Sequence, residues 1–180
     1  MLCGGESSRM GQDKAFLLAP DGRALVQVAL DALRGAGCHP VRLSARATEP
    51  FAHLDAEVVL DGWVDQGPIA GLEAALAATT TEWCLVVACD MPRLEPEFLR
   101  QLAQRALGSD CDAVVPVADG RPQPTHAVYR RTCLKPIRAA VKSGRRSLTR
   151  LLESLDVDLV PCSARPSFTN VNTPDELAEL

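Results

Sequence analysis

The sequence predicts a three-layer α/β/α fold with a mainly parallel β-sheet. Short apolar runs alternate along the chain with longer stretches whose apolar residues recur at helical spacing. Because a strand, a helix and a second strand join in right-handed crossovers, this alternation places helices on both faces of the sheet. The 180 residues, 47% of them hydrophobic, are enough for a substantial core, and we expect residues 1–180 to form a single domain.

Continuous apolar runs indicate strands that are buried on both faces. They cover residues 41–44, 57–60, 84–88 and 113–117. Apolar residues at helical spacing predict three helices, marked by Val26, Ala29, Leu30 and Leu33, by Ile69, Leu72 and Leu76, and by Leu99, Leu102, Ala103 and Ala106. A first strand should precede the glycines at positions 4 and 5, but only three residues stand there. Either residues upstream of Met1 are missing or the first strand is unusually short, and we expect the former.

The second half of the chain is less regular. Residues 126–129 read as a strand that runs antiparallel to its neighbours, and the leucines at 148, 151, 152 and 155 predict a helix. A last helix is predicted from Thr173, with Pro174 in its first turn and Glu176 completing a capping box.

Charge and cysteine content exclude several functional classes. The net charge of −4 and a pI of about 5.4 argue against a nucleic-acid partner, whereas local basic clusters suit a small anionic ligand. Seven cysteines without a C-x-x-C motif indicate neither a zinc site nor a disulfide framework, and are typical of a reducing compartment. No apolar run is long enough to cross a membrane and no signal peptide is evident, so we expect a cytoplasmic protein.

The segment LCGGESSRMGQDK, residues 2–14, is the strongest functional signal. Gly4 and Gly5 fall where the first strand ends, and glycines there let backbone N–H groups approach a phosphate or a base. Arg9 and Lys14 supply charges that can reach a triphosphate. The segment matches neither a Walker loop nor G-x-G-x-x-G. On the residues alone, a phosphate-binding loop and a plain flexible loop both remain open.

Two aspartates follow predicted strands. Asp90, in CDMP, stands at the carboxyl end of the most apolar strand, where a carboxylate is a natural Mg²⁺ ligand. Asp61 ends the strand before QGPIAGL. The alternative for each aspartate is an ordinary turn.

These motifs together resemble the molybdenum cofactor guanylyltransferases. LCGGESSRMGQDK is similar to their L-A-G-G-x-S-x-R-M-G-x-D-K signature, with Cys3 in place of alanine. The resemblance continues through DQGPIAGL, CDMP, RPQPTHAVY, GRRSL and FTNVNTPDEL, and so spans nearly the whole chain. It implies the nucleotide-diphospho-sugar-transferase-like, Rossmann-like fold, and transfer of GMP from GTP to the terminal phosphate of molybdopterin with release of pyrophosphate.

The resemblance also assigns residues. The N-terminal half of the chain would bind the nucleotide, and the residues implied for this role are Leu2, Cys3, Gly4, Gly5, Lys14, Asp61, Gly67, Gly71 and Asp90. Catalysis would depend on Arg9, Lys14 and Asp90, with Mg²⁺ on Asp90. The C-terminal half would hold molybdopterin through Asn170, Asn172 and Arg145. The family's asparagine at the end of the second strand is absent; Ser44 stands there, so a base contact is lost or taken over by Ser44.

Plainer explanations exist for several of these residues. Gly67 before Pro68 is ordinary helix capping, which leaves only Gly71 unexplained, and Asn170 or Asn172 fits an Asx turn. Arg145 fits a solvated surface, and His126 a satisfied strand residue rather than a base.

Other functions use the same scaffold. They are molybdopterin cytidylyl transfer, sugar-phosphate nucleotidyl transfer, and nucleotide binding without catalysis. Proteins that deliver molybdopterin or accept the finished cofactor are candidate partners.

Overall fold

The computed structural model describes residues 1–4, 14–63, 66–163, 166–171 and 176 of the chain. Its strands are β1 (Arg42–Ala45), β2 (Glu57–Leu60), β3 (Trp83–Val87), β4 (Ala113–Ala118), β5 (Arg121–Pro122), β6 (His126–Arg130) and β7 (Val157–Cys162). β1 and β2 pair in parallel, while β3, β6 and β4 are neighbours in that order, with β5 and β7 also paired to β4.

The first residues of the chain join these two groups of strands at the centre of the molecule. Leu2 forms parallel bridges to Ser44 on one side and to Ala88 on the other. The Leu2 N–H donates to the Val87 carbonyl at 2.8 Å, and the Cys3 N–H donates to the Ser44 carbonyl at 2.8 Å. The segment therefore serves as a very short central strand between β1 and β3, and all three of its residues are buried.

The sheet is mixed. β6 runs antiparallel to both β3 and β4, as the sequence predicts for residues 126–129, and β5 is antiparallel to β4. The α/β class is confirmed, but a mainly parallel sheet is not, because these antiparallel pairings stand beside the parallel pairs β1–β2 and β4–β7.

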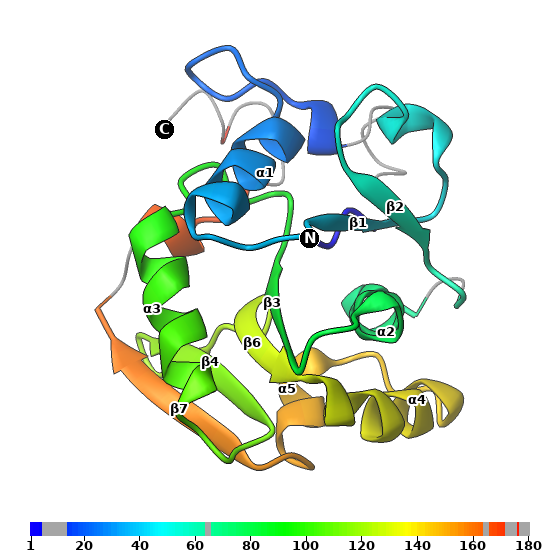
Figure 1. The fold of residues 1–180 in the computed structure, drawn as a ribbon, viewed down its shortest axis with the longest axis vertical. Coiled ribbons are helices and arrows are strands. Elements are labelled where there is room, and N and C mark those ends of the chain that lie inside the picture. The colour runs from blue at the N-terminus through cyan, green and yellow to red at the C-terminus, as the bar shows by residue number, and fades with distance from the viewer. Residues whose placement is uncertain (5–13, 64–65, 164–165, 172–175, 177–180) are drawn as a thin grey trace.

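Helices cover both faces of the sheet. They are α1 (Leu25–Gly35), α2 (Pro68–Ala78), α3 (Pro96–Leu107), α4 (Leu134–Lys142) and α5 (Leu148–Leu152), with short 3₁₀ turns at Lys14–Phe16, Glu49–Phe51, Arg131–Cys133 and Pro166–Phe168. Figure 1 shows α1 and α3 on one side of β3, and α2 and α4 on the other. These are the three layers that the sequence predicts.

Alternate residues of the strands supply the two cores. Val87, from β3, packs in a cluster with residues of α1, whereas its neighbour Val86 packs with residues of α2, α4 and α5. Leu2 belongs to the second cluster, between Met1 and Cys3 of the first. Successive side chains of a strand point to opposite faces, so one short central strand contributes to both cores.

The sequence-based element predictions match the structure unevenly. The four apolar runs correspond to β1–β4, and each predicted helix through residue 106 is present. β7 was not predicted. The predicted last helix falls on residues that, apart from Glu176, lie outside the described part of the chain. Within the described residues, no helix is long and apolar enough to span a membrane.

Candidate active site

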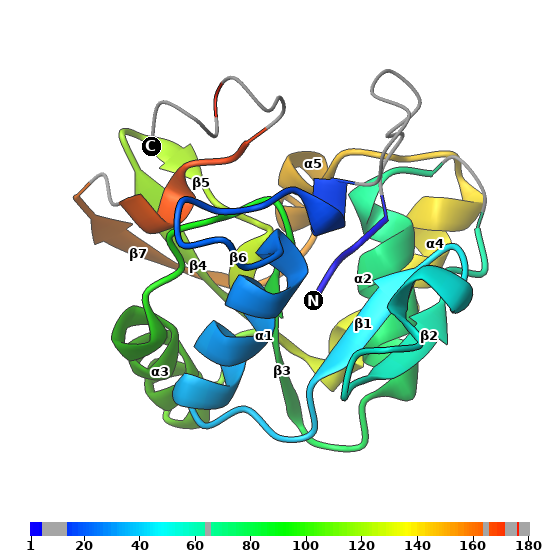
Figure 2. The same ribbon diagram turned by 90° about the horizontal axis from the view of Figure 1, so that it is seen from above.

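The candidate site lies where β1, the central segment and β3 end. Figure 2 shows the chain running from its N-terminus, between β1 and α1, toward this edge. Gly4, the residue that follows Cys3, approaches Asp61 so closely that a Cβ added to Gly4 would lie 2.6 Å from Oδ2 of Asp61. A side chain there would displace the carboxylate, which explains glycine at this position. Gly5 and Arg9 lie outside the described residues.

Asp61, directly after β2, is held by Ser44 of β1. The Ser44 hydroxyl donates a hydrogen bond to Oδ1 of Asp61. Burial raises the pKa of the Asp61 carboxyl group, while this hydrogen bond and the charge of Arg46 act in the opposite direction. Ser44 is itself 2% exposed, so its hydroxyl has little access to solvent and is directed at the carboxylate.

Gly71, inside α2, completes the packing around this pair. A Cβ on Gly71 would lie 2.9 Å from Oγ of Ser44 and 3.2 Å from Cδ2 of Leu2. The helix can approach the central strand only because this position carries no side chain. A glycine at position 71 therefore leaves the space that the Ser44–Asp61 pair needs beside α2. This requirement explains a glycine inside a helix, which the helical pattern alone does not.

Asp90 follows β3 on the other side of the central segment. Its Oδ1 is buried and has no hydrogen-bond partner among the described residues. Burial raises the pKa of Asp90, and the positive charge of Lys14 lowers it. A buried carboxylate oxygen with no partner, with a cation close enough to influence it, is chemically suited to a divalent metal ion.

The C-terminal part of the chain returns to Asp90. The Val171 N–H donates to the main-chain carbonyl of Asp90 at 2.9 Å, and Val171 is fully buried. Asn170, the residue before it, is exposed beside this edge of the sheet. The structure thus brings Asn170, for which the resemblance implies molybdopterin binding, near the end of β3. Asn172 lies outside the described residues.

Gly67 and Arg145 lie at the rim. Gly67 is the N-cap of α2 and has a φ of 70°, a left-handed conformation that favours glycine. A Cβ there would lie 3.9 Å from the Arg146 carbonyl, so the segment before α5 adjoins the start of α2. Arg145, in that segment, is exposed.

His126 lies in an apolar aromatic cluster rather than at the reacting centre. It is fully buried, with its ring centroid 5.6 Å from that of Phe98 and 5.0 Å from that of Phe168. Neither ring nitrogen has a hydrogen-bond partner among the described residues, so the sequence-based expectation of a satisfied histidine is wrong. Burial lowers its pKa to about 4. A neutral imidazole without access to solvent is unsuited to proton transfer with a substrate.

The described residues contain no cluster of three or more His, Cys, Asp or Glu side chains suited to a metal ion. A metal at Asp90 would consequently depend on substrate and water oxygens for most of its ligands, which is a common arrangement for Mg²⁺. Sequence reasoning found both aspartates from their positions after apolar runs. It missed the bond from Ser44 to Asp61, which depends on the pairing of β1 with β2.

Comparison with known proteins points to one family. The model of the MobA-like NTP transferase domain matches residues 1–159. The chain is 33% identical over 181 residues to a probable molybdenum cofactor guanylyltransferase of Mycobacterium marinum, covering 98% of this chain and 89% of that protein. It is 36% identical over 185 residues to a protein of the same name from Opitutus terrae, covering 98% of this chain and 90% of that protein.

Solved structures share the fold. The crystal structure of molybdopterin-guanine dinucleotide biosynthesis protein A from Archaeoglobus fulgidus has a TM-score of 0.80 and 29% identity, over 99% of this chain and 93% of that chain. A 2-C-methyl-D-erythritol 4-phosphate cytidylyltransferase from Thermus thermophilus has a TM-score of 0.72 at 21% identity, over 92% of this chain and 91% of that chain. With its central glycine segment flanked by two half-buried aspartates, and with the family model matched from residue 1 to residue 159, the chain belongs to the MobA-like NTP transferase domain family.

Proposed function

We propose that this protein is a molybdenum cofactor guanylyltransferase, which transfers GMP from GTP to the terminal phosphate of molybdopterin and releases pyrophosphate. The observation that carries the proposal is the arrangement around Leu2. Its backbone bridges Ser44, which holds Asp61, and Ala88, two residues before Asp90. A nucleotide on the glycine segment would therefore have one carboxylate on each side.

The reaction needs positioning more than a strong base. A phosphate oxygen of molybdopterin attacks the α-phosphorus of GTP, a new phosphorus–oxygen bond forms, and the bond to the bridging oxygen of the β-phosphate breaks as pyrophosphate leaves with the electron pair. The attacking phosphate is already ionised at neutral pH, so no side chain has to remove a proton. The rate then depends on alignment and on neutralising negative charge.

Each polar residue has a distinct part in this scheme. The backbone from Leu2 to Gly5 would face guanine and ribose, and Asp61 would accept hydrogen bonds from the nucleoside. Lys14, whose charge already acts on Asp90, would contact the triphosphate, and Arg9 would balance the leaving pyrophosphate. Gly67 and Gly71 would shape the wall beside the base.

Asp90 would hold Mg²⁺, because its buried Oδ1 has no partner among the described residues. When bound, the ion supplies positive charge to the triphosphate. Asp90 itself offers one carboxylate, and its burial keeps bulk water away from that side. A related fold from Mycobacterium tuberculosis, 20% identical with a TM-score of 0.72, has been solved in complex with manganese.

The C-terminal half would hold molybdopterin within the same single domain. Asn170 lies beside the end of β3 because Val171 is bonded to Asp90, and Asn172 follows in the sequence. Arg145 stands at the rim near Gly67, where its charge would meet the pterin phosphate. In-line displacement requires the attacking oxygen of the molybdopterin phosphate to lie opposite the leaving pyrophosphate across the α-phosphorus of GTP.

The test is release of pyrophosphate with molybdopterin and Mg²⁺, run in parallel with GTP, CTP and ATP. Release with GTP alone supports the proposal. Asp90→Asn should abolish this release while the variant remains folded, and Lys14→Ala should mainly weaken the affinity for GTP. Release with CTP alone would make the protein a cytidylyltransferase, and wild-type turnover by Asp90→Asn would refute the metal assignment.

A further inference from the structure

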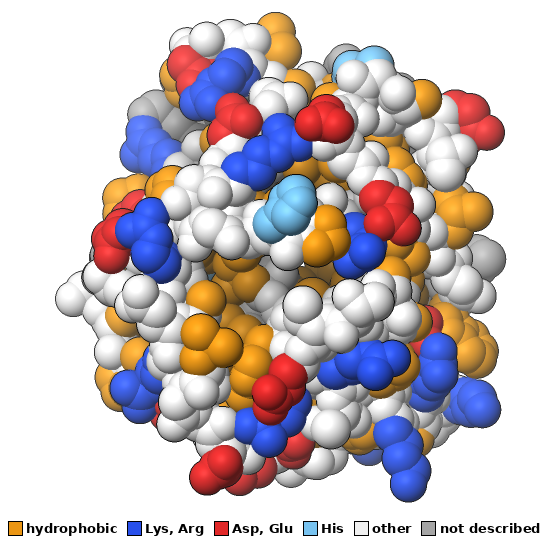
Figure 3. Space-filling model, in the orientation of Figure 1, with side chains coloured by type: hydrophobic (Ala, Val, Ile, Leu, Met, Phe, Trp, Pro, Cys, Tyr) orange, Lys and Arg blue, Asp and Glu red, His pale blue; other side chains and the backbone are white. Residues whose placement is uncertain are grey.

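Basic residues are concentrated in one stretch of this acidic chain. Residues 120–152 contain nine of the 19 Lys and Arg residues and none of the 23 Asp and Glu residues, although the whole chain has a net charge of −4. Such segregation is stronger than a mixed, solvated surface requires, and it produces a local positive field. Figure 3 shows Lys and Arg side chains gathered over the region of α4.

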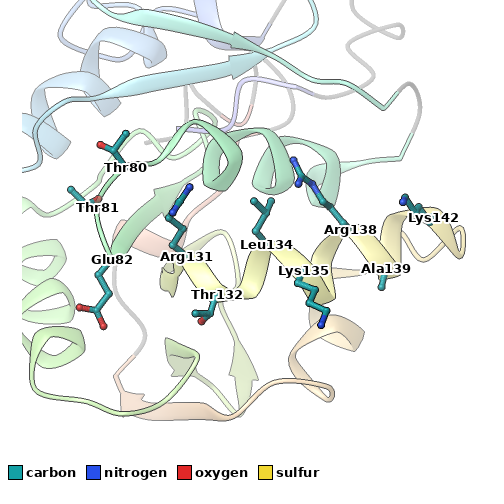
Figure 4. A pocket seen from close by; sticks show the side chains of 10 residues that line it. All are labelled: Thr80, Thr81, Glu82, Arg131, Thr132, Leu134, Lys135, Arg138, Ala139 and Lys142. Carbon is teal, nitrogen blue, oxygen red and sulfur yellow. The ribbon is translucent and has the colours of Figure 1, made fainter.

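The cations line one side of a groove. The groove has a volume of about 730 Å³ and lies between α4, the turn that precedes it, and the residues before β3. Lys135, Arg138 and Lys142 follow each other at intervals of three and four residues, so they share one side of α4. Arg131 lies four residues before Lys135, in the 3₁₀ turn that precedes the helix. The opposite side of α4 is buried through Ile137, Ala140 and Val141. Figure 4 shows these side chains around the groove.

The nearby carboxylates do not neutralise all of these cations. Glu73 is paired with Arg138 at 2.6 Å, and Glu82 lies 3.6 Å from Arg130. Arg131, Lys135 and Lys142 make no ion pair with any carboxylate that the structure describes. Leu134 and Ala139 add apolar surface between them. The groove therefore presents three positive charges without an ion-pair partner among the described residues, arranged around an apolar strip formed by Leu134 and Ala139.

This groove is separate from the candidate active site. Thr80, Thr81 and Glu82 line it at the start of β3, whereas Asp90 follows the end of that strand. Eight residues separate Glu82 from Asp90, so at roughly 3.3 Å per residue of extended chain the two lie about 25 Å apart. A substrate phosphate bound near Asp90 would not reach Lys135. The C-terminal end of α4, however, leads toward Arg145 at the rim of the active site.

We propose that this groove is the docking site for an acidic helical segment of a partner protein. From Arg131 to Lys142 the cationic side extends about 16 Å, which matches about three turns of a helix. Carboxylates at matching intervals would pair with Arg131, Lys135 and Lys142, and an apolar side chain between them would cover Leu134. Charges so arranged accelerate association and fix orientation more than they add affinity.

A protein segment fits this surface better than a nucleic acid. The cationic side is short, and the remainder of the chain contains all of the acidic residues, which repel a polyanion that extends beyond the groove. The apolar strip also has no counterpart in a phosphate backbone. The proposal does not depend on the nucleotide reaction, because docking needs neither substrate.

The experiment measures binding of a labelled amphipathic peptide to the intact protein by fluorescence anisotropy. The probe is a helical peptide with glutamates at i, i+4, i+7 and i+11 and a leucine between them. We expect binding that weakens as salt is added and falls at least tenfold in Lys135→Glu/Lys142→Glu. The matched control, Arg34→Glu/Arg100→Glu, changes the net charge equally on the opposite layer of helices and should retain the affinity.

Four results would overturn the proposal. One is equal loss in the control variant, which would show unspecific attraction. Another is competition of the peptide with GTP, which would place it at the active site. Tighter binding of a single-stranded oligonucleotide with the same dependence on Lys135 and Lys142 would identify a nucleic acid as the occupant. A concentration-dependent dimer that the double variant dissolves would identify a second copy of this chain. Pyrophosphate release should be unchanged in both double variants.

Discussion

The hydroxyl group of Ser44 donates a hydrogen bond to the carboxylate of Asp61, across the parallel pairing of β1 and β2. Ser44 is thereby the residue that orients Asp61 toward Gly4, whose missing side chain leaves room for Oδ2. It stands where relatives are expected to place an asparagine for the nucleotide. We propose that in this chain the position acts on the nucleotide through the neighbouring carboxylate of Asp61.

Replacing Ser44 with alanine should weaken nucleotide binding and shift its pH dependence. Burial raises the pKa of Asp61 and the Ser44 bond lowers it, so loss of the bond raises this pKa further. Because ionised Asp61 is the acceptor, affinity is lost as the pH falls through its pKa, and Ser44→Ala should lose it at a higher pH. If Asp61 is no longer oriented, the hydrogen bond that the nucleoside would donate to it is lost. Such a bond to a charged group is worth about 1.5–3 kcal/mol, so the affinity for GTP should fall roughly tenfold or more.

Calorimetric titration with GTP at several pH values, in steps of about one pH unit from pH 5 to pH 8, measures this shift in the pH dependence of the affinity. Ser143→Ala is the matched control, since the Ser143 hydroxyl donates to the Ala140 carbonyl at 2.8 Å in another part of the molecule. An unchanged pH profile in Ser44→Ala would show that Ser44 does not orient Asp61 for binding.

Gly71→Ala should weaken GTP binding even though alanine favours a helix by about 1 kcal/mol over glycine. The new Cβ would stand 2.9 Å from Oγ of Ser44, so the hydroxyl group must move and its bond to Asp61 is disturbed. Gly108→Ala, where the nearest atom lies 3.8 Å away, is the control. If Gly71→Ala binds GTP as the wild type does, α2 can move without loss and the packing argument fails.

Asp90→Asn should make the protein more stable while it removes activity. The pKa of Asp90 is raised in the folded state, so folding is penalised once this carboxyl group ionises, and the penalty is present at neutral pH. Asparagine has no charge to bury. The melting temperature should rise by roughly 2–4 °C at pH 7, the effect of about 1 kcal/mol in a chain of this size.

The gain should shrink as the pH falls, because the wild-type carboxyl group then takes up its proton. Thermal unfolding at several pH values, without metal and beside the exposed control Asp110→Asn, measures both effects. A lower melting temperature for Asp90→Asn at pH 7 would mean that contacts favourable to the charge, Lys14 foremost, outweigh its burial.

His126→Phe should make stability less sensitive to acid. The folded pKa of His126 is about 4, against 6.5 in a model peptide, so the unfolded state takes up the proton first as the pH falls. Between pH 7 and pH 5 this residue alone should cost the wild type about 2 kcal/mol of unfolding free energy. Urea unfolding at both pH values measures it, with the exposed His53→Gln as control; equal losses in His126→Phe and wild type would be inconsistent with a buried neutral imidazole.

The sequence was most informative where one local pattern determines the structure. Continuous apolar runs are visible in the sequence, so β1 to β4 were predicted closely, although β2 is only partly buried. β7 was not, because its residues alternate between partly buried and exposed positions and include Pro161. Its place follows from pairing with β4, a contact between distant parts of the chain that no local pattern records.

The same distinction applies to the site. Asp61 and Asp90 could be proposed because aspartates at the ends of apolar runs are visible in the sequence. The reason for Gly71 could not be found, since it rests on Leu2 and Ser44, which only the folded sheet brings beside α2. Likewise, nothing near His126 in the sequence predicts that Phe98 and Phe168 pack beside its ring and against each other.

The hydrogen bond from Val171 to the Asp90 carbonyl has a consequence for synthesis on the ribosome. Asp90 is added to the growing chain 81 residues before Val171. Until then, a nascent chain has β3 but lacks the segment that covers its carboxyl end. This flank of the candidate site therefore forms only after the chain has grown past residue 171, and shorter nascent chains do not possess it.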